Sequence, residues 1–371
     1  MHIPPFATEV YFAQYEFTTP HILCASDCET LSIAELLALA GADPAELLDL
    51  RLGYTESQGN PALRAAAAAL YTGVAPGDVV MLGAPEEGIY LTMRALLEPG
   101  DPVVVLTPAY DSLLNLAEHV SGRVNRWPIR PTPGGWALDL DNLERLVAPG
   151  TRLVVVNFPH NPTGYLPTLD EFDALIDIVA RRGAWLLCDE MYRGLERDPV
   201  DRLPSAADRY ERAIVLAGLS KTHGLPGLRA GWLIIRDPAT RDALINWKHY
   251  TTICPPAPSE ALAAVALRAH EPLAGRSRAL IAANLERAAG FFARWPELFD
   301  WRPPRAGSVA LVGLNRPSAT AYCHMLAREA GVLLLPGSCL GYDDQSVRFG
   351  FGRAAFAAAL AHYERHLEAG R

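Results

Sequence analysis

Short, unbroken runs of apolar residues recur along the middle of the chain, separated by stretches of helical character. The runs cover residues 103–106, 153–158, 184–190, 214–220 and 230–235. Continuous apolar runs of this length are typical of strands that are covered on both faces. The pattern therefore predicts a sheet that is buried between layers of helices.

The segments between these runs carry the start and stop signals of helices. Residues 65–69 are all alanine, the residue with the strongest helix propensity, and residues 112–120 form a second helical stretch. Thr168 and Glu171 form a capping box that opens a helix ending at Gly183. Strand, helix and strand in this order require crossover connections, so the sheet is expected to be mainly parallel. We predict a three-layer α/β fold.

The pattern changes after about Pro255. Strand-like runs become rare, residues 259–270 and 277–295 favour helices, and a few short strands precede a final alanine-rich helix. We therefore expect a large domain over residues 46–255 and a smaller α+β domain over residues 256–371. Residues 1–45 lack the strand–helix alternation, and we expect them to form an arm that packs on the smaller domain or on a neighbouring subunit.

Composition and charge exclude several classes of protein. With 371 residues, half of them hydrophobic, the chain can bury a large core and is not intrinsically disordered. The net charge of −9 and the absence of a basic cluster argue against a nucleic-acid partner. No apolar stretch approaches the roughly 20 residues of a membrane helix, and the N-terminus lacks a signal-peptide pattern.

Cysteine and histidine usage narrows the expectation further. Six cysteines are too sparse for a disulfide scaffold, so we expect reduced thiols in a cytoplasmic protein. The ten histidines show no metal-ligand spacing, so no metal site is expected.

Polar residues follow four of the predicted strands at the end where parallel sheets bind their ligands. These residues are Tyr110, Asn161, Asp189 with Tyr192, and Ser220 with Lys221. One polar residue after a strand is common, but an aromatic ring, an amide, a carboxylate with a phenol, and an amine at four strand ends indicate one shared site.

The order of these residues resembles the class I and II aminotransferases, which are enzymes of fold type I that depend on pyridoxal 5′-phosphate (PLP). The resemblance rests on P-x-Y at Tyr110, NPTG from Asn161, D-E-x-Y from Asp189, S-K at Lys221, and Arg229 eight residues after the lysine. The similarity extends from about Tyr54 to Arg348, and residues 218–232 are its most specific part. It implies that residues 46–255 bind PLP within the fold type I architecture.

The resemblance implies a role for each matching residue at the cofactor ring. Lys221 would hold PLP as a Schiff base and then move the α-proton of the substrate. Asp189 would pair with the pyridinium nitrogen and keep it protonated. Tyr192 and Asn161 would hydrogen-bond the 3-oxygen of the cofactor, and Tyr110 would stack on its ring.

Further matches concern the phosphate and the substrate. Arg229 would hold the phosphate, with Ser220 also at the cofactor. Tyr54 is similar to the tyrosine that reaches the phosphate of the neighbouring subunit, which implies a homodimer with shared active sites. Arg348 matches the arginine that binds the substrate carboxylate, beside Asn161. The implied substrates are an amino acid and a 2-oxo acid.

The residue types suit this chemistry. A carbanion beside an amine forms only when a conjugated electron sink accepts the charge, and a protonated pyridine ring provides that sink. A carboxylate beside the ring nitrogen favours the protonated form. Lysine can both bind a carbonyl carbon and carry a proton, and arginine is suited to bidentate binding of a carboxylate or a phosphate.

Two positions depart from the family pattern. Gly218 stands where the family commonly has a hydroxyl that binds phosphate. Within residues 82–90, which correspond to the glycine-rich phosphate turn, Pro85 removes a backbone donor and Glu86 adds a negative charge. We still expect Pro85 and Glu86 to contact the cofactor, in a phosphate site that is built differently.

Transamination is the expected reaction, and two alternatives stay open. Residues 157–164 and 220–232 also resemble capreomycidine synthase, a PLP-dependent cyclase, so elimination with ring closure of a modified amino acid is the main alternative. His223 and Glu86 are the candidates to assist a leaving group in that reaction. A regulator that uses the fold as a ligand sensor is disfavoured, because no helix-turn-helix pattern precedes Tyr54.

The N-terminal segment is rich in aromatic residues, and two interpretations of them stay open. They line the pocket for the substrate side chain, or they form only a packing arm. The residues concerned are Phe6, Tyr11, Phe12, Tyr15 and Phe17.

Overall fold

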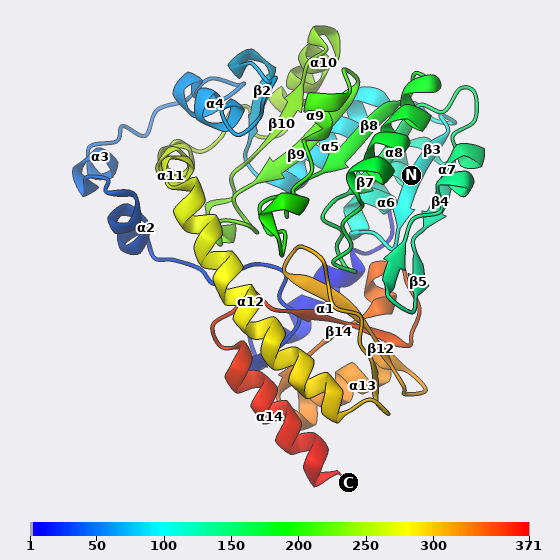
Figure 1. The fold of residues 1–371 in the computed structure, drawn as a ribbon. Helices are drawn as coiled ribbons and strands as arrows, with labels where there is room; N and C mark the ends of the chain where they lie inside the picture. The colour runs from blue at the N-terminus through cyan, green and yellow to red at the C-terminus, as the bar shows by residue number, and fades with distance from the viewer. Residues whose placement is uncertain (1–2, 371) are drawn as a thin grey trace.

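The computed structural model describes residues 3–370. A sheet of seven strands forms the centre of its larger part (Figure 1). In spatial order the strands are β2 (Val79–Leu82), β10 (Gly231–Ile235), β9 (Ala213–Gly218), β8 (Trp185–Asp189), β7 (Leu153–Asn157), β3 (Val103–Thr107) and β4 (Val124–Pro128). The pairs from β9 to β4 are parallel, whereas β10 is antiparallel to both of its neighbours, β9 and β2. The sheet is mainly parallel, as predicted.

Helices cover both faces of this sheet, which gives the three layers. One face carries α4 (Pro61–Ala68), α7 (Leu140–Leu146), α8 (Leu169–Arg181), α9 (Ala206–Arg209) and α11 (Ala257–Arg268). The other carries α5 (Pro85–Leu96), α6 (Asp111–Ser121) and α10 (Pro238–His249). The capping box of Thr168 and Glu171 is present at the start of α8.

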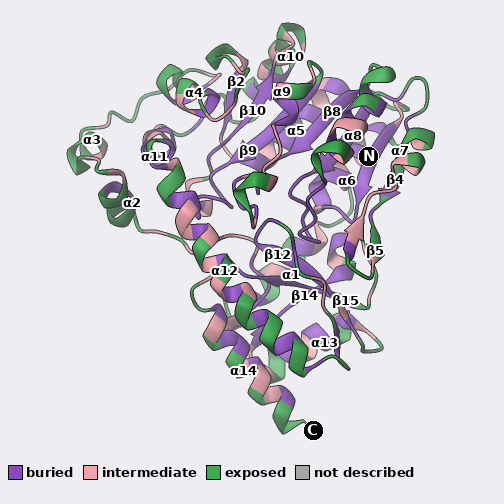
Figure 2. Ribbon diagram, viewed as in Figure 1, coloured by how far each residue is buried: buried purple, intermediate pink, exposed green. Residues whose placement is uncertain are grey.

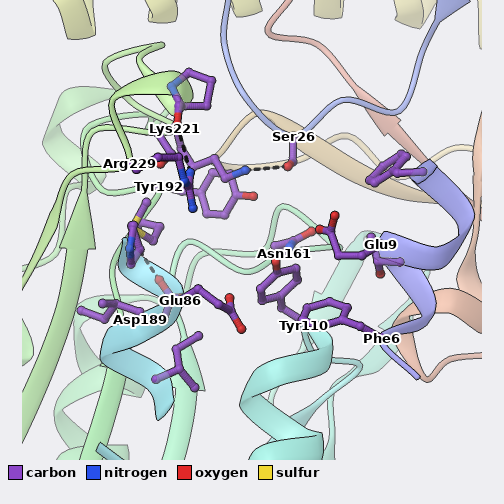
Figure 3. Close-up of a pocket in the computed structure, with 18 of the residues that line it drawn as sticks. Phe6, Glu9, Ser26, Glu86, Tyr110, Asn161, Asp189, Tyr192, Lys221 and Arg229 are labelled. Carbon is purple, nitrogen blue, oxygen red and sulfur yellow. Dashed lines mark hydrogen bonds between the residues drawn. The ribbon is translucent and has the colours of Figure 1, made fainter. Parts of the chain in front are cut away.

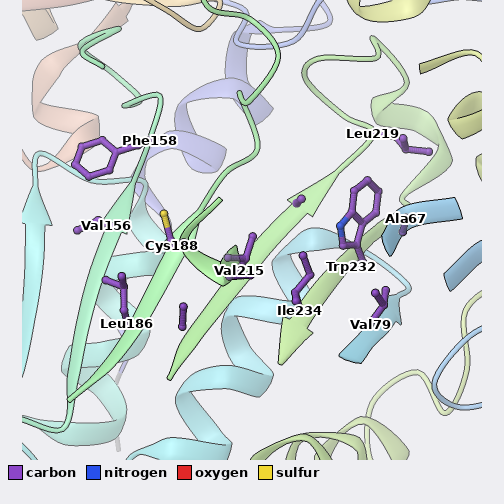
Figure 4. Close-up of a cluster of buried hydrophobic side chains, with 14 of the residues drawn as sticks. Ala67, Val79, Val156, Phe158, Leu186, Cys188, Val215, Leu219, Trp232 and Ile234 are labelled. Atoms are coloured by element: carbon purple, nitrogen blue, oxygen red, sulfur yellow. The ribbon is translucent and has the colours of Figure 1, made fainter. Parts of the chain in front are cut away.

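Alternation along each strand explains why the runs are apolar throughout. Val156, Leu186 and Val215 point to the face covered by α8, whereas Val155 and Leu187 point to the face covered by α5 and α6. Figure 4 shows the first of these layers extending across neighbouring strands to Trp232. Every residue of the other six strands is buried, whereas the edge strand β4 is partly exposed, so the sheet is covered on both faces except at that edge (Figure 2).

A second, antiparallel sheet lies in the C-terminal part of the chain. Its order is β11 (Phe299–Asp300), β12 (Val309–Leu314), β15 (Ser346–Gly350) and β14 (Leu335–Pro336). Helices α12 (His270–Arg294), α13 (Ala319–Met325) and α14 (Phe356–Ala369) complete this region, and a π-helical turn (Leu326–Ala330) follows α13. A buried cluster rich in phenylalanine forms its core.

The N-terminal segment contributes to both parts. Helix α1 (Ala7–Tyr15) inserts Tyr11 and Tyr15 into the core of the C-terminal sheet, and β1 (His21–Ile22) pairs in parallel with β13 (Val332–Leu333). Helix α2 (Ile33–Ala40) instead contacts α11 and the core of the large sheet, and α3 (Pro44–Leu48) follows it. Helix α11 begins after residue 255, where the smaller domain is predicted to start, yet its core contacts are with the large sheet.

The smaller elements connect this framework. They are the hairpin of β5 (Arg130–Thr132) and β6 (Gly135–Ala137), and the 3₁₀ turns Pro76–Asp78, Pro199–Asp201, Pro226–Leu228 and Gly337–Leu340. Between residues 3 and 370, no helix is long and apolar enough to cross a membrane.

Candidate active site

A cavity of about 600 Å³ lies where β7, β8 and β9 end, and it is closed by residues of α1 and β15 (Figure 3). Ten of the eleven predicted site residues line it: Pro85, Glu86, Tyr110, Asn161, Asp189, Tyr192, Ser220, Lys221, Arg229 and Arg348. Tyr54, the eleventh, is 92% exposed on another part of the surface. The structure therefore brings together residues that are separated by more than 260 positions in the chain.

Lys221 follows the end of β9 and directs its amine into the cavity. Its Nζ donates a hydrogen bond to Ser26 Oγ at 2.8 Å (Figure 3). Burial lowers the pKa of Lys221, and Arg348 lowers it further, while Asp27 and Asp189 oppose the shift. A lowered pKa increases the fraction of neutral amine, which is the nucleophilic form.

Asp189 is the last residue of β8 and is only 7% exposed. Its Oδ1 accepts a hydrogen bond from the Met191 N–H at 3.0 Å. Burial nevertheless raises the pKa of Asp189 to about 7, and Lys221 offsets only part of that effect. A carboxylate whose pKa is raised by burial is stabilised in its charged form when a cationic group enters the cavity beside it.

Arg348 reaches the cavity from β15 of the antiparallel sheet. It is 2% exposed; its Nε and Nη2 donate to the Cys24 carbonyl at 3.2 and 3.0 Å, and its Nη1 donates to Asn161 Oδ1 at 3.2 Å. Asn157, which the sequence analysis missed, accepts from the Asn161 N–H at 2.7 Å and donates to the Asp189 carbonyl at 2.9 Å. The NPTG segment is thus held between β8 and β15.

The aromatic residues of the N-terminal segment divide between the two interpretations. Phe6 and Phe12 line the cavity, and the Phe6 ring meets the Tyr110 ring edge-on at 5.1 Å. Tyr11 and Tyr15 are buried in the core of the C-terminal sheet, whereas Phe17 is 91% exposed. The segment is therefore both part of the cavity wall and a packing arm.

The two positions that depart from the family pattern, Gly218 and Pro85, pack against each other. A Cβ at Gly218 would lie 3.0 Å from Pro85 Cγ and 3.0 Å from the Ala230 carbonyl oxygen. A side chain at position 218 would therefore require Pro85 or the neighbouring strand to shift. Arg229, at the rim of this end of the cavity, has φ +51°, an uncommon conformation outside glycine that is often found at functional sites.

Acidic residues also line the cavity, and two of them were missed by the sequence analysis. Glu9 and Glu16 come from α1 and the residue after it, and Glu86 comes from the first turn of α5. Figure 3 shows Glu86 pointing into the open centre of the cavity, with Glu9 on the opposite wall. Burial raises the pKa of Glu86, and the nearby Glu9 carboxylate raises it further.

His223 lies outside the cavity wall, although it is two residues from Lys221. Its Nε2 shares a 2.8 Å hydrogen bond with His270 Nδ1 at the start of α12. Burial lowers the pKa of His223 to about 3. Glu86 is therefore the one of the two leaving-group candidates that faces the cavity.

The fold and the cavity together define a PLP-dependent transferase of fold type I. The family model for aminotransferase class I and II matches residues 22–362. This chain belongs to the class I and II aminotransferase family.

Individual relatives include aminotransferases, a capreomycidine synthase and a PLP-dependent cyclase. Capreomycidine synthase from Streptomyces vinaceus is 34% identical over 356 residues, which cover 94% of this chain and 90% of that protein. A PLP-dependent aminotransferase from Streptococcus suis superposes with a TM-score of 0.93 at 29% identity, over 100% of this chain and 99% of its own. The PLP-dependent cyclase OrfR superposes with a TM-score of 0.92 at 30% identity, over the same shares of the two chains.

The cavity residues fit PLP. The buried Asp189 carboxylate, with its raised pKa, is suited to a protonated ring nitrogen, and the Lys221 amine, with its lowered pKa, is suited to an aldehyde. Arg229 supplies a guanidinium for a phosphate. In residues 3–370, no group of His, Cys, Asp and Glu side chains is arranged to hold a metal ion.

The raised pKa of Asp189 predicts a pH dependence of stability for the cofactor-free protein. The folded-state pKa of about 7 lies above the ordinary value of 3.8, so the folded protein binds this proton more tightly than the unfolded chain does. The free energy of unfolding should therefore fall as the pH rises from about 4 to 7, by at most about 4 kcal/mol from this group. Asp189→Asn should lack this decline.

Urea unfolding of both proteins at several pH values measures the difference. The stability of the unsubstituted protein relative to Asp189→Asn should decrease between pH 4 and 7 and then level off. Asp170→Asn, at an exposed position of α8, is the matched control and should follow the unsubstituted protein. A difference that is constant or increases with pH would refute the assigned environment of Asp189.

Proposed function

We propose that this protein is an aminotransferase that moves the amino group of an L-amino acid to a 2-oxo acid. The observation that carries the proposal is the placement of Lys221, Asp189 and Arg348 around one buried cavity. PLP bound there supplies an electron sink for the electrons of the substrate's α-carbon.

Each side chain then has a defined task. With PLP bound, Lys221 would bind its carbonyl carbon, with the carbonyl oxygen released as water, and would carry the substrate α-proton on Nζ. Asp189 holds the ring nitrogen, while Asn161 and Tyr192 hydrogen-bond the ring oxygen. These assignments are supported by the presence of all four side chains in the lining of one cavity and by the burial that shifts the pKa values of Lys221 and Asp189.

Other residues orient the two ends of the ligands. Arg348 binds the substrate α-carboxylate, because its guanidinium is already held in one orientation by Asn161 and the Cys24 carbonyl. Tyr110 stacks on the cofactor ring. Arg229 and Ser220 bind the phosphate at the end of the cavity where Pro85 packs.

We further propose that the substrate side chain is cationic. Glu9 and Glu86 stand on opposite walls of the open part of the cavity, with Glu16 also in its lining. The Glu9 carboxylate contributes to the raised pKa of Glu86, and a cation placed between the two side chains relieves this repulsion, so a cation binds there more favourably than a neutral group. A guanidinium or an ammonium at the end of the side chain meets this requirement.

Elimination with ring closure is the second candidate reaction. It is favoured by the similarity to capreomycidine synthase over 94% of the chain and to the cyclase OrfR over its full length. Glu86 is the cavity residue that could pass a proton to a leaving group on the β-carbon.

A single-turnover experiment separates the two reactions. The holoenzyme is mixed with a panel of amino acids, without any 2-oxo acid, and the products are identified by mass spectrometry. We expect one equivalent of 2-oxo acid per active site, with the amino group retained by the enzyme and passed to a 2-oxo acid that is added later. Release of a cyclised or unsaturated product without consumption of the bound cofactor would reject transamination in favour of the second candidate.

Glu9→Gln tests the proposed preference for a cationic side chain. Loss of one carboxylate should reduce kcat/KM for arginine about 10-fold and change kcat/KM for alanine less than about 3-fold, as estimated for a lost charged hydrogen bond. Glu46→Gln, at an exposed position of α3, is the control and should change neither value. Equal losses for arginine and alanine would contradict the preference.

We also propose a homodimer with shared active sites. Tyr54 is 92% exposed and lies away from the cavity of its own subunit, which leaves it free to reach the phosphate of a partner. A two-fold axis would make this exchange reciprocal.

Mixing inactive subunits tests the shared site. Tyr54→Ala and Lys221→Ala homodimers should each have low activity. Subunit exchange between them should restore up to about a quarter of the specific activity, because half of a random mixture is heterodimer and each heterodimer has one intact site. Heterodimers that are demonstrated by mass but remain inactive would show that Tyr54 serves its own subunit.

A further inference from the structure

The sequence contains two lysines, Lys221 and Lys248, and the rest of its 33 basic residues are arginines. The proposed function uses Lys221 and leaves Lys248 without a role. Lys248 lies in the last turn of α10, and its side chain has no exposed surface. A buried ammonium is costly unless it is paired, so its partners indicate what it does.

The partners of Lys248 form a closed network around Glu87. The Lys248 Nζ lies 3.7 Å from Glu87 Oε2 and donates a hydrogen bond to Thr252 Oγ1. Thr252 Oγ1 in turn donates to Glu87 Oε1 at 2.7 Å, and Thr251 Oγ1 donates to the same oxygen. The Glu87 side chain is only 7% exposed, so this is a buried ion pair with a bridging hydroxyl.

Glu87 connects this network to the loop between β2 and α5. Its Oε2 accepts a hydrogen bond from the Gly83 N–H at 2.9 Å. A Cβ at Gly83 would lie 2.9 Å from Thr252 Cγ2, so the loop backbone is pressed against the turn that follows α10. In that turn Ile253 has φ +66°, which is an unfavourable conformation for a β-branched residue. The Lys248 carbonyl helps to hold this conformation, because it accepts a hydrogen bond from the Ile253 N–H at 3.0 Å.

The loop held in this way leads directly into α5, whose first residues Pro85 and Glu86 line the cavity. Pro85 lacks an N–H, and Gly218 lacks a hydroxyl, so two of the usual donors to a phosphate are absent from this end of the site. The remaining backbone donors at the start of α5 bind an anion only if they are kept in position.

We propose that Lys248 and Glu87 are positioning residues that hold the β2–α5 loop for the cofactor phosphate, an inference that rests on the proposed function. Lysine suits the position because its ammonium is a compact point charge, whereas the planar guanidinium of arginine requires more space and a fork of acceptors. Neither residue lines the cavity, so both act through Gly83 and the loop.

Lys248→Met tests the proposal through the phosphate itself. The apoprotein is titrated with PLP and, separately, with pyridoxal, which lacks the phosphate, and the two Kd values are compared. We expect the ratio of the pyridoxal Kd to the PLP Kd to fall at least 10-fold, with the pyridoxal Kd changed less than about 3-fold. Arg268→Met, which removes an exposed partner of Glu46, should leave the ratio unchanged.

Two further variants make the result decisive. Lys248→Met combined with Glu87→Gln removes both charges and keeps an amide oxygen for the Gly83 N–H, so the ratio should recover to within about 3-fold. Thr252→Val removes the bridging hydroxyl and keeps Lys248 and Glu87 as a pair, so neither charge is left without its partner. This variant should also lower the ratio of the two Kd values, and it provides the test if Lys248→Met fails to fold. A ratio that stays within 2-fold in every folded variant would overturn the proposal. Failure of the unsubstituted apoprotein to bind PLP would instead reject the proposed function.

Discussion

The rest of the site depends on one constraint: charged groups are removed from water where the parallel strands end. Lys221, Asp189 and Arg348 all lose solvent there, which lowers the pKa of Lys221 and raises that of Asp189. Buried polar groups are stable only when hydrogen-bonded. Their partners come from the N-terminal segment, the NPTG segment and the antiparallel sheet, so the site is complete only in the folded chain.

The layers of the fold and the strand-end residues of the cavity could be predicted from the sequence, because both depend on local signals. Apolar runs mark strands that are covered on both faces, and parallel strands place their carboxyl ends along one edge. Asp189 is the last residue of β8, and Lys221 lies three residues beyond the end of β9, so these two had to come close together. Resemblance to a family then supplied Arg348, which lies on another sheet and carries no local signal.

The contributions of distant segments could not be predicted from local patterns. Ser26 precedes its partner Lys221 by 195 residues, and Glu9 lies in a helix whose other face packs on the C-terminal core. The close packing of Pro85 against Gly218 could be recognised only from the structure, where a Cβ at position 218 would come too close to the Pro85 ring. Likewise, the direction of β10, antiparallel to both β2 and β9, could not be predicted, because its apolar pattern is the same as that of the parallel strands.

The two lysines of the chain allow a direct test of the central claim, that the buried Lys221 amine is the group that binds PLP. The holoenzyme is reduced with borohydride, which makes the bond between the cofactor and its lysine permanent, and peptides are then mapped by mass spectrometry. We expect one equivalent of cofactor on Lys221 and none on Lys248, whose side chain is inaccessible. Label on Lys248, or a reduced protein that carries no cofactor on either lysine, would contradict it.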